Sequence, residues 1–132
     1  MSVEEVEAQP DAVIGKFLVK SFTATVLFDT CASHSYISRG FVDKYKLPTQ
    51  ALRSPMLVTS LGAEYMASLW CDWLPLRIGN YVFPSDLIVL ESQGLDVILG
   101  MDWLSKYRGN IECASKSIFL TTPEGRRIKY VS

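Results

Sequence analysis

The sequence is poor in the residues that build disulfide frameworks and metal sites. Its 132 residues include 3 cysteines and 1 histidine. The cysteines Cys31, Cys71 and Cys113 are odd in number and widely spaced, which argues against a disulfide framework. A single histidine, His34, leaves no Cys/His ligand set for zinc. We therefore predict neither disulfides nor a bound metal.

The chain also lacks an excess of charge and a long apolar run. Its 13 Lys and Arg residues nearly balance 14 Asp and Glu residues, for a net charge of -1. This balance gives no broad attraction for phosphate backbones or anionic membranes, so neither nucleic acid nor a membrane is a predicted partner. No apolar run approaches the roughly 20 residues of a membrane-spanning helix, and the N-terminal residues are acidic rather than basic and then apolar. The sequence predicts a soluble, intracellular and most simply cytoplasmic protein.

What the sequence does contain is the composition of one globular domain. Hydrophobic residues make up 48% of the chain, which is enough for a core. Residues 1–11 are acidic and polar, and we interpret them as a flexible tail before a domain over residues 12–132. One domain of this length has little room for two lobes around a cleft. A deep active site would have to be assembled between chains.

Short apolar runs separated by turn residues predict an all-β barrel or sandwich. Two short helices are expected, one capped by Ser38 and ending at Tyr45, and one over Met101–Tyr107 closed by Gly109. The predicted strands are Val13–Val19, Phe22–Phe28, Met56–Thr59, Tyr65–Leu69, Leu74–Ile78, Tyr81–Phe83, Leu87–Leu90, Val97–Leu99, Asn110–Cys113, Lys116–Thr121 and Arg126–Val131.

Asp29 is the most informative single residue. It ends an apolar run and leads into Thr30, Cys31, Ala32 and Ser33, which are small enough for a sharp turn. A carboxylate in this place either hydrogen-bonds loop amides or carries chemistry. One carboxylate by itself cannot act as both acid and base, so a catalytic Asp29 needs a second group.

Two segments resemble the signatures of retropepsin-like aspartic proteases. Val26–Ser38 resembles the active-site strand and loop, and Leu95–Leu104 resembles the second signature, in which two apolar residues and a glycine lead into a short helix. The resemblance extends over about residues 11–131 and is closest to the polyproteins of plant Ty3/gypsy retrotransposons. It implies a small, closed, barrel-like retropepsin fold in a homodimer.

The resemblance also implies an activity and a set of site residues. Asp29 and its symmetry mate would share a proton and activate water for peptide hydrolysis. The expected partners are a second copy and an extended peptide or polyprotein, with no metal or organic cofactor. Thr30 would brace the two loops across the dimer axis, and Ala32 would lie beside the substrate. The other implied residues are Ser33 in the loop, Ile98, Leu99 and Gly100 behind it, and Ser60, Leu61, Gly62 and Ala63 in a flap.

Cys31 departs from the pattern, since the family has glycine there. If this position requires a positive φ, the added Cβ strains the loop, whereas at an ordinary φ the thiol can lie to one side. Two alternatives follow: a weakly active or inactive retropepsin-like module for binding or dimerisation, and a Cys31–His34 nucleophile and base.

The remaining distinctive residues are assigned structural roles. We expect Asp96 to be a loop or dimer-contact charge and Asp102 to favour the first turn of a helix. Buried, small hydrophobic roles are predicted for Cys71 and Cys113. Core or interface roles are predicted for Trp70, Trp73 and Trp103.

Overall fold

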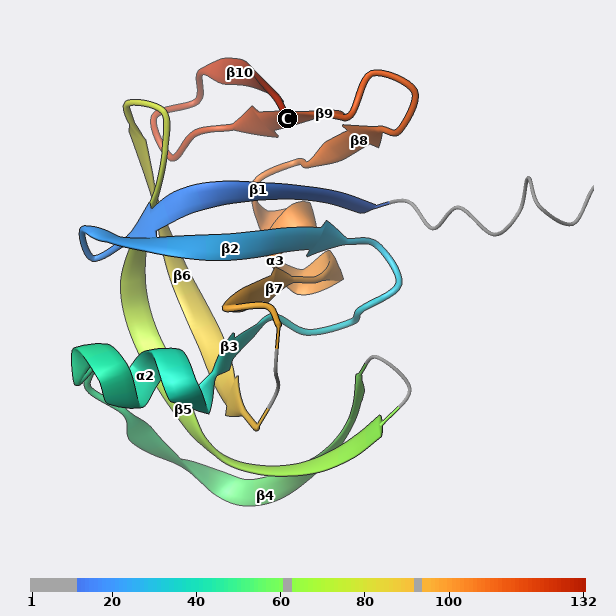
Figure 1. Cartoon of the computed structure of the whole chain (residues 1–132). Coiled ribbons are helices and arrows are strands. Elements are labelled where there is room, and N and C mark those ends of the chain that lie inside the picture. Colours follow the sequence, from blue (N-terminus) through green and yellow to red (C-terminus); the bar gives the residue numbers. More distant parts are fainter. Residues whose placement is uncertain (1–11, 61–62, 92–93) are drawn as a thin grey trace, which may run out of the picture.

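In the described part of the chain, the strands form a ring that is accompanied by two short helices (Figure 1). The computed structural model describes residues 12–60, 63–91 and 94–132. The predicted tail therefore lies outside the described residues. The elements are β1 Ala12–Val19, β2 Phe22–Asp29, β3 Tyr36–Ser38, α2 Arg39–Tyr45, β4 Gln50–Ser60, β5 Ala63–Ile78, β6 Tyr81–Leu90, β7 Val97–Leu99, α3 Met101–Lys106, β8 Asn110–Glu112, β9 Ser117–Thr121 and β10 Arg127–Val131. This confirms the all-β class with two short helices.

The larger sheet has seven strands in the order β1-β2-β7-β3-β6-β5-β4. It curls round so that β1 also pairs with β5, through Leu18 opposite Arg77 and Val19 opposite Leu76. Two residue pairs close the ring, so the sheet is not a regular barrel. The expected closed, barrel-like fold is thus present as a ring of strands. Strands β10, β9 and β8 form a separate three-stranded sheet.

The alternation of side chains along β2 separates the core from the site. Ala24, Val26 and Phe28 are buried in the main apolar core, together with Phe83 and Trp103. Successive side chains of a strand point to opposite faces, so Leu27 and Asp29 share the other face. Leu27 packs against a second, smaller apolar cluster. Burial of one face of β2 thus fixes the direction of the Asp29 side chain on the opposite face.

Both predicted helices are present. The Ser38 side chain accepts a hydrogen bond from the Phe41 N–H at 3.1 Å, and α2 ends at Tyr45, which confirms both the cap and the end of this helix. Helix α3 ends one residue earlier than expected, at Lys106, and the left-handed residue after it is Arg108, with φ of 51°, rather than Gly109. A Cβ at Gly109 would lie 2.5 Å from the end of the Leu104 side chain, which would have to shift.

Several predicted strands are parts of longer ones. Tyr65–Leu69 and Leu74–Ile78 belong to the 16-residue β5, which continues through a register shift between Cys71 and Leu74. Tyr81–Phe83 and Leu87–Leu90 likewise merge in β6. A bulge absorbs the irregular residues without ending the strand.

One prediction of burial is wrong. Cys113 is exposed, whereas Cys71 is buried as predicted. Trp103 belongs to the core, whereas Trp73 is 67% exposed, so of the two predicted roles only an interface role stays open for Trp73. Among the described residues, no helix is long and apolar enough to cross a membrane.

Candidate active site

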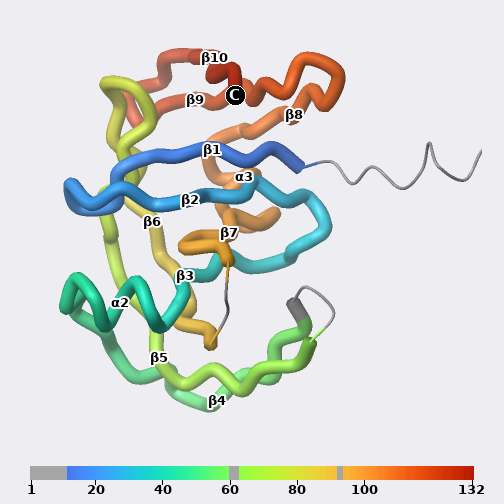
Figure 2. The backbone as a smooth tube through the Cα atoms, in the orientation of Figure 1, coloured from blue at the N-terminus to red at the C-terminus, as the bar shows by residue number. Residues whose placement is uncertain are grey.

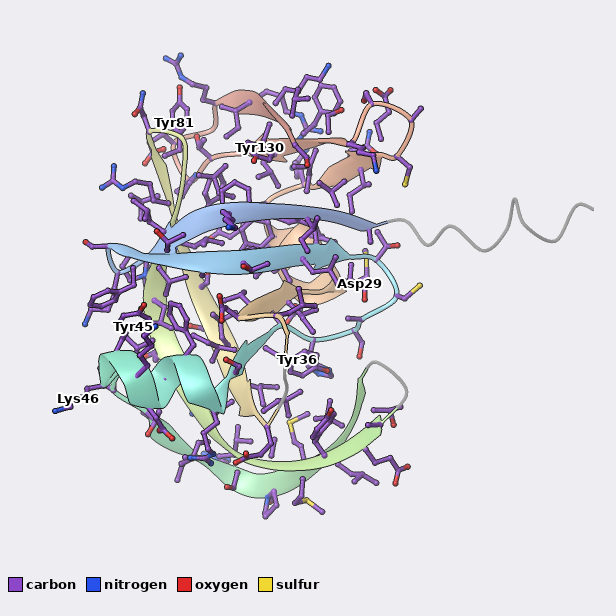
Figure 3. All side chains as sticks on the ribbon, viewed as in Figure 1. Asp29, Tyr36, Tyr45, Lys46, Tyr81 and Tyr130 are labelled. Atoms are coloured by element: carbon purple, nitrogen blue, oxygen red, sulfur yellow. The ribbon has the colours of Figure 1, made fainter. Side chains whose placement is uncertain are left out.

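Asp29 is the last residue of β2, next to the loop that leads to β3 (Figure 3). It is half-buried, and the Cys31 N–H donates to its Oδ1 at 2.9 Å. The Ala32 N–H donates to the Asp29 carbonyl oxygen at 3.3 Å, which folds the chain into a tight turn. The hydrogen bond from Cys31 occupies one carboxylate oxygen and orients the group.

Cys31 is exposed and its backbone is unstrained. The described residues other than glycine with positive φ are Lys20, Ser21, Lys46, Trp73, Arg108 and Lys116, and Cys31 is not among them. The loop therefore adopts its shape without requiring glycine at this position. The possibility that positive φ at Cys31 strains the loop is therefore wrong.

Helix α3 holds the far side of the loop. The Met101 N–H donates to the carbonyl oxygen of Ala32 at 2.7 Å, and the Asp102 N–H donates to that of Ser33 at 3.3 Å. Gly100 makes this approach feasible, because a Cβ on it would lie 2.6 Å from the Ala32 oxygen. The glycine of the second signature, Gly100, is thus explained by its close contact with the backbone of the first signature.

A buried serine, Ser35, connects the same two segments. Its Oγ accepts from the Gly100 N–H at 3.0 Å and donates to Asp102 Oδ1 at 2.6 Å. That carboxylate oxygen also accepts from the Trp103 N–H at 2.6 Å. Ser35 and the carboxylate of Asp102 are site residues that the sequence prediction missed. The sequence signal that could have identified Ser35 is a small polar residue directly before a buried strand.

The segment of the second signature pairs with the strand that ends at Asp29. In β7, Val97, Ile98 and Leu99 run parallel to β2, with Ile98 opposite Leu27. Leu99 belongs to the main core and Ile98 to the second cluster. The segment enters the sheet through Asp96, whose side-chain Oδ2 accepts from the Thr25 N–H at 2.8 Å. Asp96 therefore holds strand β2 rather than acting as a free charge.

The hairpin of β4 and β5 contributes its inner face to the same region. Val58 and Ala67 are buried in the second cluster with Ile98, and Ala32 packs against that cluster. In Figure 2 the described ends of the hairpin and the loop after β2 lie on the same side of the molecule. Of the implied flap residues, Ser60 pairs with Ala63. Leu61 and Gly62 lie outside the described residues.

Two other loop residues were implied to have roles. Thr30 is half-buried and Ser33 is exposed. The Ser33 Oγ lies 3.1 Å from His34 Nδ1, so the imidazole contacts this hydroxyl. That contact gives no support to a Cys31–His34 pair.

Burial and charge alter two acidic groups near the sheet. Burial, and secondly the charge of Asp102, raise the pKa of Tyr36, which follows the loop after β2. Burial raises the pKa of the Cys71 thiol to about 11, so that thiol is neutral and unreactive at physiological pH. Within the described ranges, no three His, Cys, Asp or Glu residues form a group suited to a metal ion.

Comparison with known proteins points to one family. No curated protein matches the chain by sequence comparison. Among solved structures, the retroviral protease-like domain of Ddi1 from Leishmania major is similar, with a TM-score of 0.64, 15% identity, and coverage of 82% of this chain and 86% of that one. The EIAV protease in complex with the inhibitor HBY-793 has a TM-score of 0.57 and 16% identity, with coverage of 70% of this chain and 85% of that one. At these identities the two structures share the fold. The family model described as retroviral aspartyl protease matches residues 1–126, and the chain therefore belongs to the retroviral aspartyl protease family.

Proposed function

We propose that this chain is an aspartic endopeptidase that works as a homodimer, with Asp29 of each copy forming the catalytic dyad. The observation that carries the proposal is the fixed carboxylate of Asp29 at the end of β2, oriented by the Cys31 N–H. One carboxylate per chain requires a second copy for the complementary role. The match to the family model supports both parts of the proposal.

The proposed reaction uses the pair as acid and base. Two carboxyl groups roughly 3 Å apart do not ionise together easily, so they share one proton. The ionised Asp29 takes a proton from water, and the protonated one donates to the peptide carbonyl oxygen. A tetrahedral intermediate forms and collapses without a covalent bond to the enzyme. No metal or organic cofactor takes part in these steps.

The surrounding residues supply positioning in this proposal. Ala32 packs against the second apolar cluster, and we assign its neighbourhood to the backbone of an extended peptide. Ile98, Leu99 and Gly100 hold the loop from behind, and Ser33 completes it. Hairpin β4–β5, including Ser60 and Ala63, would close over the substrate as a flap and exclude water other than the nucleophile. Thr30 would brace the two loops across the dimer axis.

We further propose that the substrate is the polyprotein of a Ty3/gypsy-type retroelement. The segments Val26–Ser38 and Leu95–Leu104 support this assignment by their resemblance to such polyproteins. An extended peptide suits a site bordered by a hairpin, because exposed strand edges can pair with a substrate backbone.

The test is cleavage by purified protein of internally quenched peptides that span polyprotein junctions, at mildly acidic pH. We expect cleavage that pepstatin inhibits, and Asp29→Asn should lower kcat by about 10³-fold or more. Asp43→Asn removes a carboxylate from an exposed site on α2 and is the matched control. Sedimentation should give twice the 14.8 kDa of one chain. An active monomer, or full activity of Asp29→Asn, would refute the dyad.

The second candidate function is an inactive module for binding or dimerisation, and it rests on the exposed Cys31 side chain beside Asp29. The variant Cys31→Gly separates the two candidates. Equal cleavage by both proteins supports the enzyme. Cleavage by Cys31→Gly alone supports a module whose catalytic loop is intact but obstructed by the thiol.

A further inference from the structure

Trp73 is held in an unusual position on the surface. Its side chain is 67% exposed and its backbone has φ of 53°, in the region that favours glycine. It lies in the bulge of β5, and its N–H donates to Asp86 Oδ1 at 2.9 Å. A large exposed ring on a strained backbone costs stability, so a contribution to function is the simplest reason to keep it.

A groove of about 350 Å³ lies beside this ring. We name it the Trp73 groove, and its lining includes Trp73, Pro84, Lys106, Tyr107, Arg108 and Pro123. Tyr107 is buried and donates its hydroxyl hydrogen to the Pro84 carbonyl oxygen at 2.5 Å, which fixes the floor. Rigid aromatic and proline side chains beside arginine are typical of the centres of protein interfaces.

The charged residues in the lining of the Trp73 groove, Lys106 and Arg108, are both cations. Lys106 lies over the rings of Trp73 and Tyr107, with its Nζ 5.7 Å and 5.2 Å from their centroids. Arg127 extends to the same rim, where its Nη1 donates to the Arg108 carbonyl oxygen at 2.7 Å. In the part of the chain that the structure describes, the salt bridge is between Arg39 and Glu91. Lys106, Arg108 and Arg127 therefore form no salt bridge with the described residues.

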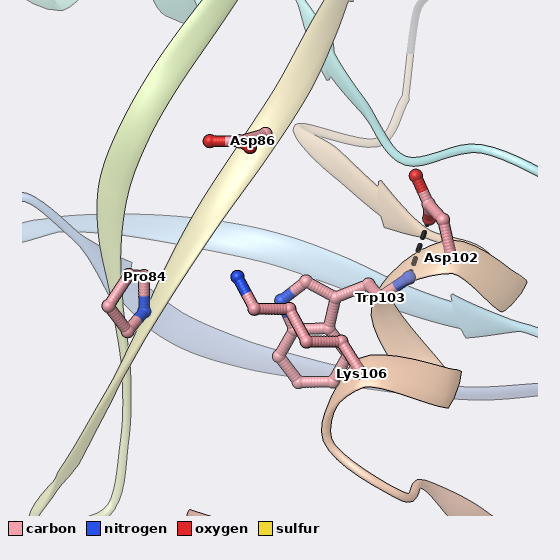
Figure 4. A pocket seen from close by; sticks show the side chains of 5 residues that line it. All are labelled: Pro84, Asp86, Asp102, Trp103 and Lys106. Atoms are coloured by element: carbon pink, nitrogen blue, oxygen red, sulfur yellow. Dashed lines mark hydrogen bonds between the residues drawn. The ribbon is translucent and has the colours of Figure 1, made fainter. Parts of the chain in front are cut away.

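Two carboxylates lie next to the groove but do not line it. Figure 4 shows Asp86 and Asp102 in a smaller adjoining pocket that shares Pro84 and Lys106 with the groove. The charge of Asp86 reaches the groove lining, where burial and secondly this charge raise the pKa of Tyr107. Asp86 is engaged by the Trp73 N–H and Asp102 by Ser35. The exposed Glu124 follows Pro123 in the chain, and it is outside the groove lining.

We infer that the Trp73 groove is a docking site for an acidic peptide segment of another protein, with an aromatic side chain that stacks on Trp73 and carboxylates that face Lys106 and Arg108. Helix α3 separates this surface from the catalytic loop, since its first residues hold Ala32 and Ser33 whereas its last residue lines the groove. Docking there leaves Asp29 free. This role does not depend on the proposed peptidase activity.

The experiment measures fluorescence anisotropy of a labelled nonapeptide with the repeat Asp-Phe-Glu, and of its counterpart with the repeat Lys-Phe-Lys. We expect the acidic peptide to bind and the basic one not to bind. Trp73→Gly and the double variant Lys106→Glu with Arg108→Glu should each raise Kd at least tenfold. Lys44→Glu is the matched control, because Lys44 also lies over an aromatic ring, that of Tyr45, at 5.3 Å on another face.

A folding control keeps the result interpretable. Glycine accepts the φ of Trp73, so Trp73→Gly should unfold at the same or a higher temperature than the parent. Absence of acidic-peptide binding, or equal binding by the groove variants and the parent, overturns the inference. So does tighter binding of a nine-nucleotide RNA, or a fall in sedimenting mass of the double variant, since these results assign the groove to nucleic acid or to a second copy.

Discussion

The close contact between Gly100 and the loop after Asp29 makes Gly100→Ala a quantitative test of how the candidate site is built. An alanine Cβ would lie 2.3 Å from the His34 carbonyl oxygen and 2.6 Å from that of Ala32. Both are backbone atoms, so no side chain can rotate away. Reaching an ordinary contact near 3.4 Å requires the loop to move by about 1 Å.

Such a movement has a cost in stability and in rate. Overpacking costs about 1–3 kcal/mol, and we expect the upper value, about 3 kcal/mol, because the shift also disturbs the Met101-to-Ala32 hydrogen bond. For a chain of this size that corresponds to a fall of about 10 °C in Tm. A displacement of about 1 Å at a catalytic group lowers the rate roughly 100-fold. Thermal unfolding followed by circular dichroism and the peptide cleavage assay measure the two effects.

Gly40→Ala is the matched control for Gly100→Ala. A Cβ at Gly40 meets nothing within 4 Å, and the residue lies in helix α2. Alanine there should raise the free energy of unfolding by about 0.5 kcal/mol, since it has the higher helix propensity. If Gly100→Ala were as stable as Gly40→Ala, the loop would not be clamped by α3, and the account of the second signature would be refuted.

The two remaining predictions concern the buried serine and the thiols. Ser35→Ala removes the acceptor of the buried Gly100 N–H and one donor to Asp102, and we expect a loss of about 1–3 kcal/mol in urea unfolding with partial rescue by Ser35→Thr; equal stability of all three proteins would contradict the network. Iodoacetamide at pH 8 should label Cys31 and Cys113 within minutes and spare Cys71, whose thiol pKa is raised to about 11 by burial. The contribution of the neutral Cys71 thiol to the free energy of unfolding is complete below about pH 9 and is lost as the pH rises through about 11. In the labelling experiment, peptide mass mapping that finds Cys71 labelled first would contradict its burial.

The local order of the chain was predictable where one element carried its own signal. The cap at Ser38 followed from residue type and position. So did the end of that helix at Tyr45. These features depend on neighbours within four residues, which a single sequence records.

The predictions failed where long-range contacts decide. The bulge that extends β5 past Trp73 depends on Asp86, which is 13 residues away and accepts from the Trp73 N–H. Burial of Cys113 was wrong because β8 is a three-residue strand in the smaller sheet, with exposed positions on either side. The role of Ser35 depends on Gly100, 65 residues away. Sequence spacing alone carries no record of such pairings.

The effect of Cys31 on the loop also had to be read from the structure, because it depends on the backbone conformation at this position. Glycine at a turn is usually explained by its freedom to adopt positive φ, and on that basis cysteine would strain the loop. The observed backbone removes this cost, because the turn closes through hydrogen bonds to Asp29 with Cys31 outside the positive-φ region. What distinguishes cysteine from glycine at this position is therefore its exposed side chain. It follows that Cys31→Gly should change the free energy of unfolding by less than about 1 kcal/mol, so any large change in cleavage must arise from the space that the thiol occupies.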